Sequence, residues 1–178
     1  LTQQCLESVL KHSFQVKEVF VIDNGSRDDT PEVLKKFIPL FQSQHIHFEV
    51  VTNQNNLGFG RACNQGIRRS TGEYVVILNN DTWVMPKWDQ VLVGKMNEHT
   101  VDCIGPYFYE GEAASEDALL RLAHDFTQRN RNSVRKHFVP ILMMFRKSAL
   151  DQLRFDHQGL FDERFFVTYE DTDVKEQM

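Results

Sequence analysis

Residues 74–81 read Tyr74-Val75-Val76-Ile77-Leu78-Asn79-Asn80-Asp81, in which five apolar residues run directly into three polar ones. A short apolar run rich in β-branched and aromatic residues is typical of a buried strand. Asn and Asp are common at strand ends because their side chains bond neighbouring backbone groups. Carboxylate and amide oxygens are also ligands for Mg²⁺ and Mn²⁺, which usually keep positions open for phosphates. The end of this strand is therefore either a turn or the place of a metal-bound diphosphate.

A second apolar run ends in the same way. Residues Glu18-Val19-Phe20-Val21-Ile22 lead into the polar turn Asp23-Asn24-Gly25-Ser26. In an open α/β sheet, ligands bind beyond the carboxyl ends of the strands. If the two strands are neighbours, their polar ends face one site, which favours a ligand site over two unrelated turns.

Helical and strand-like patterns alternate along most of the chain. Helices are predicted over 1–11, 30–38, 61–69, 86–96, 116–126 and 148–153, and strands over 18–22, 47–52, 74–78, 102–106 and 138–145. Pro39 is expected to bend or end the second helix, and the polar, basic segment 128–137 is interpreted as a loop. Such alternation predicts an α/β fold with a mostly parallel central sheet and helices on both faces.

Composition limits the class of protein. The chain has 178 residues, 41% of them hydrophobic, which suits one globular domain, and its net charge of -5 lacks the basic footprint of a nucleic-acid-binding protein. Cys5, Cys63 and Cys103 match neither a disulfide framework nor a zinc pattern, so reduced, buried thiols are expected. The histidines show no paired ligand spacing and are interpreted as scattered surface residues. No apolar stretch is long enough to span a bilayer and no leader opens the chain, so a cytoplasmic protein is expected.

Four motifs in register resemble one known family. They are Val21-Ile22-Asp23-Asn24-Gly25-Ser26, then Asn56-Leu57-Gly58-Phe59-Gly60 with Asn64 and Gly66, then Gly72-Glu73-Tyr74 leading to Leu78-Asn79-Asn80-Asp81, and finally Glu170-Asp171. Together they resemble the family 2 inverting glycosyltransferases, and the Asn-Asn-Asp variant looks most like the rhamnosyltransferase-type branch. The resemblance implies a GT-A (Rossmann-like) fold, a nucleotide-sugar donor such as a UDP- or dTDP-sugar, and a divalent metal, Mn²⁺ or Mg²⁺. It also implies a glycan or lipid-linked acceptor in the synthesis of cell-surface polysaccharide or glycan.

The resemblance implies donor-binding residues in two segments. Asp23 and Asn24 match the strand-end pair that binds the base and ribose of the donor, and the alternative for Asp23 is a helix-capping loop. Gly58, Arg61 and Asn64 belong to a segment that lies beside the nucleotide in the family. Asn64 is open to a second interpretation, in which it ties two loops together.

The metal and the general base are also implied by the resemblance. Asp81 matches the last acid of the metal-binding motif, and Asn80 lies beside it at the donor. Asp171 matches the base that takes the proton from the acceptor hydroxyl, with Glu170 as the second choice. From the residues alone, this acidic pair is also interpretable as the first turn of a helix, where carboxylates are favoured.

The sequence departs from the family pattern in two respects. Many relatives carry an acid where this chain has Asn79 and Asn80, which leaves one carboxylate for a metal. Relatives begin with an apolar strand before the helix that starts here at Leu1, and they continue past Met178. Residues 1–178 are therefore expected to form a single catalytic domain that is truncated at both ends and lacks the first strand.

These departures leave alternatives to a glycosyltransferase. One is a noncatalytic or degenerate nucleotide-sugar-binding module. Another is a nucleotidyltransferase, which is disfavoured because no glycine- and lysine-rich triphosphate loop opens the chain. No nucleic-acid partner and no transmembrane segment are expected, and peripheral association with the inner face of the membrane is left open.

Overall fold

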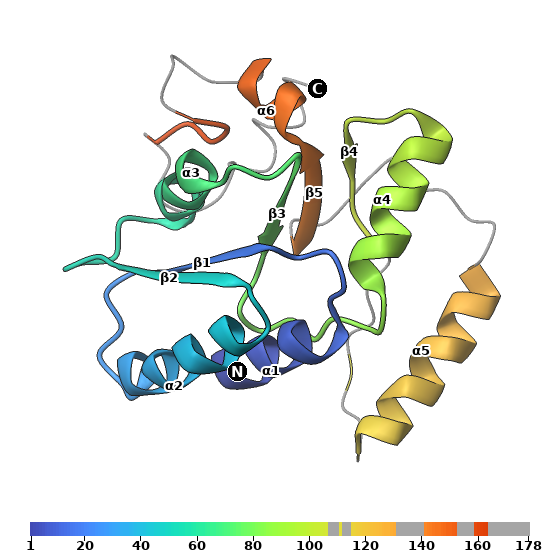
Figure 1. Cartoon of the computed structure of the whole chain (residues 1–178), viewed down its shortest axis with the longest axis horizontal. Helices are drawn as coiled ribbons and strands as arrows, with labels where there is room; N and C mark the ends of the chain where they lie inside the picture. Colours follow the sequence, from blue (N-terminus) through green and yellow to red (C-terminus); the bar gives the residue numbers. More distant parts are fainter. Residues whose placement is uncertain (107–110, 112–114, 131–140, 153–158, 164–178) are drawn as a thin grey trace.

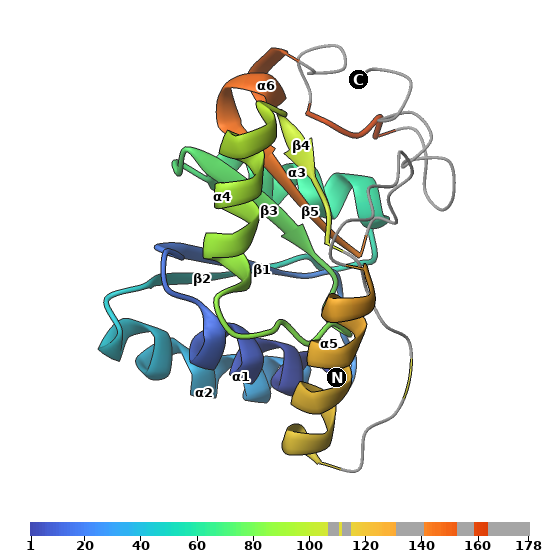
Figure 2. The same cartoon turned by 90° about the vertical axis from the view of Figure 1, so that its right-hand side faces the viewer.

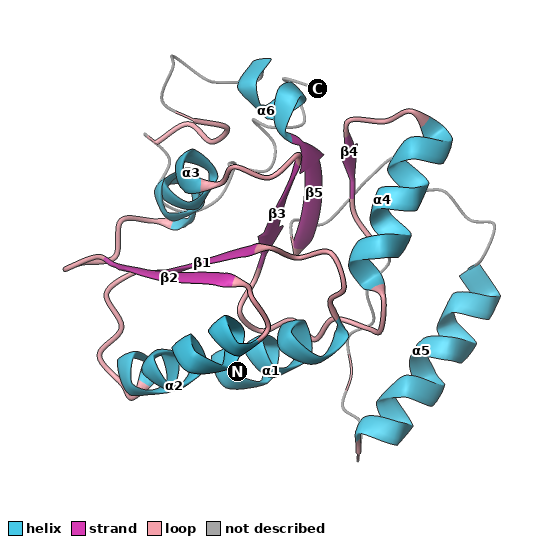
Figure 3. Cartoon of the chain, in the orientation of Figure 1, coloured by secondary structure: helices cyan, strands magenta, loops and turns pink. Residues whose placement is uncertain are grey.

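The computed structural model describes residues 1–106, 111, 115–130, 141–152 and 159–163 of the chain. Helices and strands alternate along it (Figures 1 and 3). In order, the elements are α1 (Thr2–His12), β1 (Glu18–Asp23), α2 (Thr30–Ser43), β2 (His47–Thr52), α3 (Phe59–Arg69), β3 (Tyr74–Leu78), α4 (Trp88–His99), β4 (Cys103–Ile104), α5 (Glu116–Asn130), β5 (Leu142–Arg146) and α6 (Lys147–Gln152). The predicted strands 18–22, 47–52 and 74–78 are confirmed.

The described strands form two sheets. β1 and β2 pair in parallel, with Asp23 opposite Thr52 at their carboxyl ends. β5 lies between β3 and β4 and runs antiparallel to both. The alternation of helices and strands in the sequence predicted the parallel pair. It did not predict that β5 runs antiparallel, because the pattern of apolar residues does not give the direction of a strand. Among the described strands, β1 pairs only with β2 and β3 only with β5, so each has one edge without a strand partner.

Helices cover both faces of the β1–β2 sheet, as the sequence predicts. In Figure 1, α1 and α2 lie side by side below this sheet, while α3 lies above it. Figure 2 shows the same layers from the side, with α4 beside the sheet that contains β3, β4 and β5. Within the part of the chain that the structure describes, no helix combines the length and apolar character needed to cross a bilayer.

The sheet of β3 and β5 separates two apolar cores. Val75 and Ile77 of β3 belong to a core that includes Phe161, whereas Val76 and Leu78 pack against the core formed by α1, α2 and α4. Successive residues of a strand point to opposite faces, so a strand between two cores is apolar along its whole length. β3 is therefore fixed on both faces, and this fixes the point at which Asn79 to Asp81 leave the sheet.

Several predicted boundaries differ from the structure, among them the ends of α2 and α5. α2 does not end at Pro39 but continues to Ser43. Pro39 removes one backbone donor, yet Leu34, Phe37 and Phe41 provide a buried apolar face on both sides of it, which holds the helix together. α5 extends to Asn130, so the first residues of the segment predicted to be a loop are helical.

The burial of some polar side chains also differs from expectation. His12 is 6% exposed and not a surface residue, and its burial lowers the pKa of its imidazole, with Lys11 acting in the same direction. None of the three cysteines forms a disulfide, as predicted, and Cys5 is buried, although Cys63 and Cys103 are only partly buried. Burial raises the pKa of Cys5 to about 11 and that of Cys103 to about 12, so both thiols stay protonated at neutral pH.

A buried carboxylate joins α4 to the connection between α1 and β1. Asp89 is 3% exposed, and its Oδ2 accepts hydrogen bonds from the backbone N–H groups of Phe14 at 2.7 Å and Gln15 at 2.6 Å. Backbone donors that lose their partner inside a protein are costly, because no water replaces it. Asp89 therefore fixes the turn that leads into β1.

Replacing Asp89 by alanine should lower the free energy of unfolding by about 3 kcal/mol, because two backbone donors lose a charged acceptor. Urea unfolding measures this change. Asp102 is the matched control, since its side chain is 70% exposed and lies 3.5 Å from Arg146 Nε, and exposed pairs contribute little. Equal losses for Asp89→Ala and Asp102→Ala would contradict this role.

Candidate functional site

The carboxyl end of β1 forms a tight polar turn. Asp23 is 4% exposed, and its Oδ1 accepts a hydrogen bond from the Ser26 N–H at 2.9 Å. Gly25 has φ +86°, and a Cβ there would lie 3.0 Å from the Asn55 carbonyl carbon, so the turn requires glycine. No described residue bonds the other carboxylate oxygen of Asp23, Oδ2. That oxygen remains as an acceptor at the strand end.

Asn24 holds the loop that follows β2. Its Oδ1 accepts from the Leu57 N–H at 3.0 Å and from Asn53 Nδ2 at 3.1 Å. Its Nδ2 donates to Asn56 Oδ1 at 2.8 Å and to the Gly58 carbonyl at 3.2 Å. The carboxamide thus uses both donors and its acceptor within one loop, and it fixes residues 53–58 against the end of β1.

The same loop starts α3. Gly58 is the N-cap residue with φ +88°, a conformation that favours glycine, and its N–H donates to Asn56 Oδ1 at 2.9 Å. Arg61 lies in the first turn of α3 and is exposed, and its Nε donates to the backbone carbonyl of Glu163 at 2.8 Å. The loop, α3 and the end of β1 therefore form one connected unit.

Asn64 lies in the middle of α3 and faces inward. It is 0% exposed. Its Nδ2 donates to the Phe161 carbonyl at 2.7 Å, and its Oδ1 accepts from the Phe161 N–H at 3.1 Å. Of the two interpretations that the sequence left open, the hydrogen bonds of Asn64 fit the one in which it ties two segments together.

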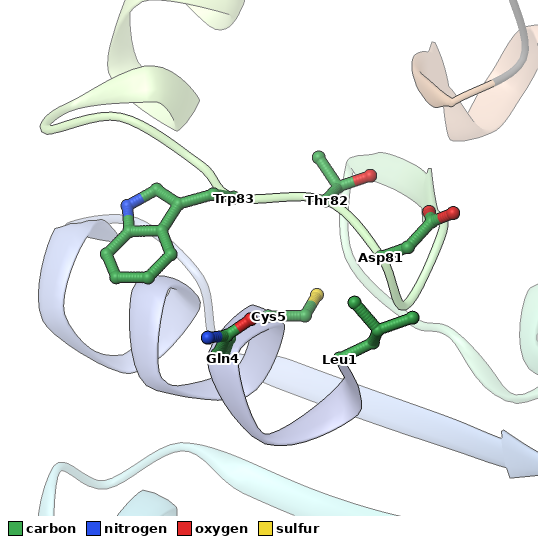
Figure 4. Close-up of a pocket in the computed structure, with 6 residues that line it drawn as sticks. All are labelled: Leu1, Gln4, Cys5, Asp81, Thr82 and Trp83. Atoms are coloured by element: carbon green, nitrogen blue, oxygen red, sulfur yellow. The ribbon is translucent and has the colours of Figure 1, made fainter. Parts of the chain in front are cut away.

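The carboxyl end of β3 lies beside the start of α1. Asn80 Nδ2 donates to Thr2 Oγ1 at 2.8 Å. Asp81 is exposed and has no hydrogen-bond or ion-pair partner among the described residues. A small pocket of about 40 Å³ is lined by Leu1, Gln4, Cys5, Asp81, Thr82 and Trp83 (Figure 4). The Asp81 carboxylate is therefore available to a ligand at the rim of this pocket.

Three residues close to Asp81 in the sequence have a buried polar atom without a partner in the described chain. The atoms are Asn79 Oδ1, Thr82 Oγ1 and Trp83 Nε1. Figure 4 shows that the side chains of Asp81 and Thr82 point to the same side of the segment, while Trp83 turns the other way. Buried polar groups are usually satisfied, so this concentration of unpaired atoms is unusual. It fits a place where a bound group supplies the missing partners.

The two strand ends remain separate clusters in the described structure. No hydrogen bond or ion pair joins Asp23 or Asn24 to Asp81 in residues 1–106. The described residues also contain no group of three His, Cys, Asp or Glu side chains able to hold a metal. Glu170 and Asp171 lie outside the described residues.

The family model for glycosyl transferase family 2 matches residues 1–154. The chain belongs to glycosyl transferase family 2. Glycosyltransferase GlyA of Streptococcus pneumoniae serotype 4 is 28% identical over 112 residues, which cover 62% of this chain and 15% of that protein. Glycosyltransferase GlyG of the same organism is 25% identical over 175 residues, covering 90% of this chain and 57% of that protein. The poly-beta-1,6-N-acetyl-D-glucosamine synthase of Staphylococcus epidermidis is 35% identical over 80 residues, covering 45% of this chain and 18% of that protein.

Solved structures show the same fold. Residues 1–349 of TarS from S. aureus, in complex with UDP, superpose with a TM-score of 0.69 at 18% identity, covering 99% of this chain and 50% of that chain. The mannosyltransferase PcManGT from Pyrobaculum calidifontis, in complex with GDP-Man and Mn²⁺, gives a TM-score of 0.69 at 19% identity, covering 99% of this chain and 47% of that chain. The predicted GT-A fold is confirmed. This family 2 chain spans only part of the length of these relatives.

The contact between Glu163 and α3 in this family 2 domain was not predicted from the sequence. Glu163 contacts α3 from almost a hundred positions away, with its Oε1 3.1 Å from Arg68 Nη1 and its carbonyl bonded to Arg61. Neither periodicity nor local motif spacing reports such a long-range pair. The only signal in the sequence was the match of Asn64 to the family pattern, and it did not name the partner.

In this family 2 domain, Asn24→Ala should lower the free energy of unfolding by about 2 kcal/mol, because the loop loses its central hydrogen bonds. Hydrogen exchange of the Leu57 amide should also become faster, since its acceptor is removed. Asn55→Ala is the matched control, because no described residue hydrogen-bonds its side chain. If both variants unfold at the same urea concentration, the Asn24 carboxamide does not hold the loop.

Proposed function

We propose that this family 2 domain transfers a sugar from a nucleoside-diphosphate donor to an acceptor hydroxyl, with inversion, in a metal-dependent reaction. The match to the family over residues 1–154 carries the proposal. Relatives named for a polysaccharide synthase support a role in the synthesis of cell-surface polysaccharide or glycan. The acceptor is then a glycan or a lipid-linked molecule.

The end of β1 supports a site for the donor nucleotide. Asp23 Oδ2 is an acceptor that suits a pyrimidine imide N–H or a ribose hydroxyl. Asn24 and Gly58 shape the loop beside it, and Arg61 is exposed on the first turn of α3, where its terminal nitrogens suit a diphosphate. We propose a UDP- or dTDP-sugar donor and a rhamnosyltransferase-like specificity. The related TarS structures contain UDP or UDP-GlcNAc.

The residues at the carboxyl end of β3 support the proposal of a site for a divalent cation. Asp81 offers a carboxylate, and Asn79 Oδ1 and Thr82 Oγ1 are neutral oxygens without described partners. These are all oxygen ligands, which suits Mn²⁺ or Mg²⁺ with further positions open for the donor phosphates. When bound, the ion would act as a Lewis acid that neutralises charge on the departing nucleoside diphosphate. Asn80, which bonds Thr2, would hold this segment beside the donor.

The acidic pair Glu170 and Asp171 completes the proposed reaction. Asp171 accepts the proton of the acceptor hydroxyl as the oxygen attacks the anomeric carbon, and Glu170 is the second choice for this role. Attack from the face opposite the leaving group, in one displacement, inverts the anomeric configuration. A carboxylate in this role must be close to the acceptor and free to take a proton.

We further propose that residues 1–178 belong to one catalytic domain, which works in the cytoplasm or at the inner face of the membrane. One observation favours the alternative of a noncatalytic nucleotide-sugar-binding module. Asp81 is the only carboxylate in the segment 79–83, so the metal site would depend on a single charged ligand.

Thermal unfolding with UDP, dTDP and GDP, each with and without Mn²⁺, tests the donor site. One nucleotide should raise the unfolding midpoint, and Mn²⁺ should increase the effect, because a ligand that binds only the folded state stabilises it. Asp81→Asn should remove the Mn²⁺-dependent part and keep the rest. Asp102→Asn, which changes an exposed carboxylate on another part of the surface, is the control. A metal effect that persists in Asp81→Asn would rule this carboxylate out.

Asp171→Asn separates catalysis from binding. We expect this variant to keep the nucleotide-dependent thermal shift and to lose sugar transfer at least about 100-fold, since a general base contributes factors of this size. Release of the nucleoside diphosphate from the sugar donor measures transfer. Full activity in Asp171→Asn would refute the base, and binding without transfer in the unsubstituted chain would favour the noncatalytic module.

A further inference from the structure

The Asn64 side chain holds the segment Gly159–Glu163 against the middle of α3. Asn64 bonds both the N–H and the carbonyl of Phe161, at 3.1 and 2.7 Å, as the next strand of a sheet would. Its Nδ2 also lies 3.3 Å from Glu163 Oε1. Both polar atoms of a fully buried carboxamide are thus committed to a segment almost a hundred residues away in the sequence.

The approach of Gly159 to Asn64 leaves no room for a side chain. A Cβ on Gly159 would lie 2.3 Å from Cγ of Asn64, 2.4 Å from its Oδ1 and 2.6 Å from its Nδ2. Contacts under 3 Å force one of the partners to move. The carboxamide therefore requires glycine at position 159, and the two residues fit each other as a pair.

Contacts on either side of Asn64 fix the rest of the segment. The Glu163 carboxylate lies 3.1 Å from Arg68 Nη1 and its carbonyl accepts from Arg61 Nε at 2.8 Å. Phe161 is 0% exposed and packs edge-on against Phe59, with ring centroids 5.6 Å apart. The segment is therefore attached along α3 by polar contacts at one end and by an aromatic ring in the core.

α3 consequently connects two parts of the molecule. Its N-terminus begins at Gly58, in the loop that Asn24 fixes at the end of β1. Its middle carries Asn64 and, through it, the segment that continues along the chain to Glu170 and Asp171. A helix of 11 residues is stiff over this length. The helix therefore fixes the position of one part relative to the other.

We propose that Asn64 is a positioning residue for sugar transfer. It fixes Gly159–Glu163, the part of the chain that precedes Glu170 and Asp171 in the sequence, relative to the donor loop. This inference rests on the proposed glycosyltransferase function. Asn64 acts on the rate of transfer and not on the affinity for the nucleotide, because its side chain bonds Phe161 and Glu163 and no residue of the loop 53–58 that Asn24 holds.

A double-mutant cycle tests the contact without any activity assay. Gly159→Ala should reduce the folding equilibrium constant at least about 10-fold more in the unsubstituted chain than in an Asn64→Ala background, since the three atoms that a new Cβ would meet are absent from that background. The cost of Gly159→Ala to the backbone is the same in both backgrounds, and it therefore cancels in the coupling energy of the cycle. Additive effects in urea unfolding would overturn the proposed contact.

Transfer kinetics test the positioning role. Asn64→Ala should lower kcat at least about 10-fold while the dissociation constant for the nucleotide changes less than about 3-fold, because misplacement affects chemistry more than binding. Gln65→Ala should instead raise the dissociation constant for the nucleotide and change kcat little, since Gln65 bonds Asn53 in the donor loop at 2.9 and 3.1 Å. Arg69→Ala, an exposed change on the same helix, is the neutral control.

The outcomes test the positioning role of Asn64 and the proposed function separately. A coupled cycle together with an unchanged kcat in Asn64→Ala would overturn the positioning role and leave a purely structural contact. Absence of transfer in the unsubstituted chain overturns the proposed function itself, and the positioning role with it, while the unfolding cycle still reports on the contact. Loss of transfer together with loss of nucleotide binding in Asn64→Ala would also overturn the proposal.

Discussion

The Asn24 carboxamide is the interaction on which the rest of the arrangement depends. Its hydrogen bonds fold the loop of residues 53–58 back onto the end of β1, and that loop ends at Gly58, where α3 begins. α3 then carries Asn64, which holds Gly159–Glu163. A network in which every member is satisfied is rigid, because breaking any bond leaves a polar group without a partner. The part of the molecule that we propose to bind the donor is therefore formed before any ligand binds.

The end of β3 has the opposite character. The strand itself is fixed between two cores, but Asn79, Thr82 and Trp83 each keep a buried polar atom without a partner in the described chain. The carboxylate of Asp81 likewise has no hydrogen-bond or ion-pair partner among the described residues. A rigid strand thus delivers an incomplete polar cluster. This contrast suits a site in which one half is preformed and the other is completed by an ion and a diphosphate, as the proposed function requires.

The sequence predicted those features that depend on local pattern. The apolar run of β3 and the turn Asp23-Asn24-Gly25-Ser26 carry their signals within a few residues, and both are present. Features that depend on distant partners were not predictable. The antiparallel course of β5 is set by what it pairs with, the continuation of α2 past Pro39 is set by the apolar face it buries, and the partner of Asn64 is almost a hundred residues away. His12 was misread for the same reason, because its burial comes from tertiary packing and not from its own sequence surroundings.

We propose that the ends of β1 and β3 bind one donor. The most direct test is NMR of the isotope-labelled chain, with UDP and GDP added first and a low concentration of Mn²⁺ second. We expect the nucleotide to change the chemical shifts of Asp23–Ser26 and of Leu57–Gly60. We also expect Mn²⁺ to broaden resonances around Asp81, and this broadening should become stronger when the nucleotide is present. Nucleotide shifts confined to one strand end, or broadening centred on another part of the chain, would contradict it.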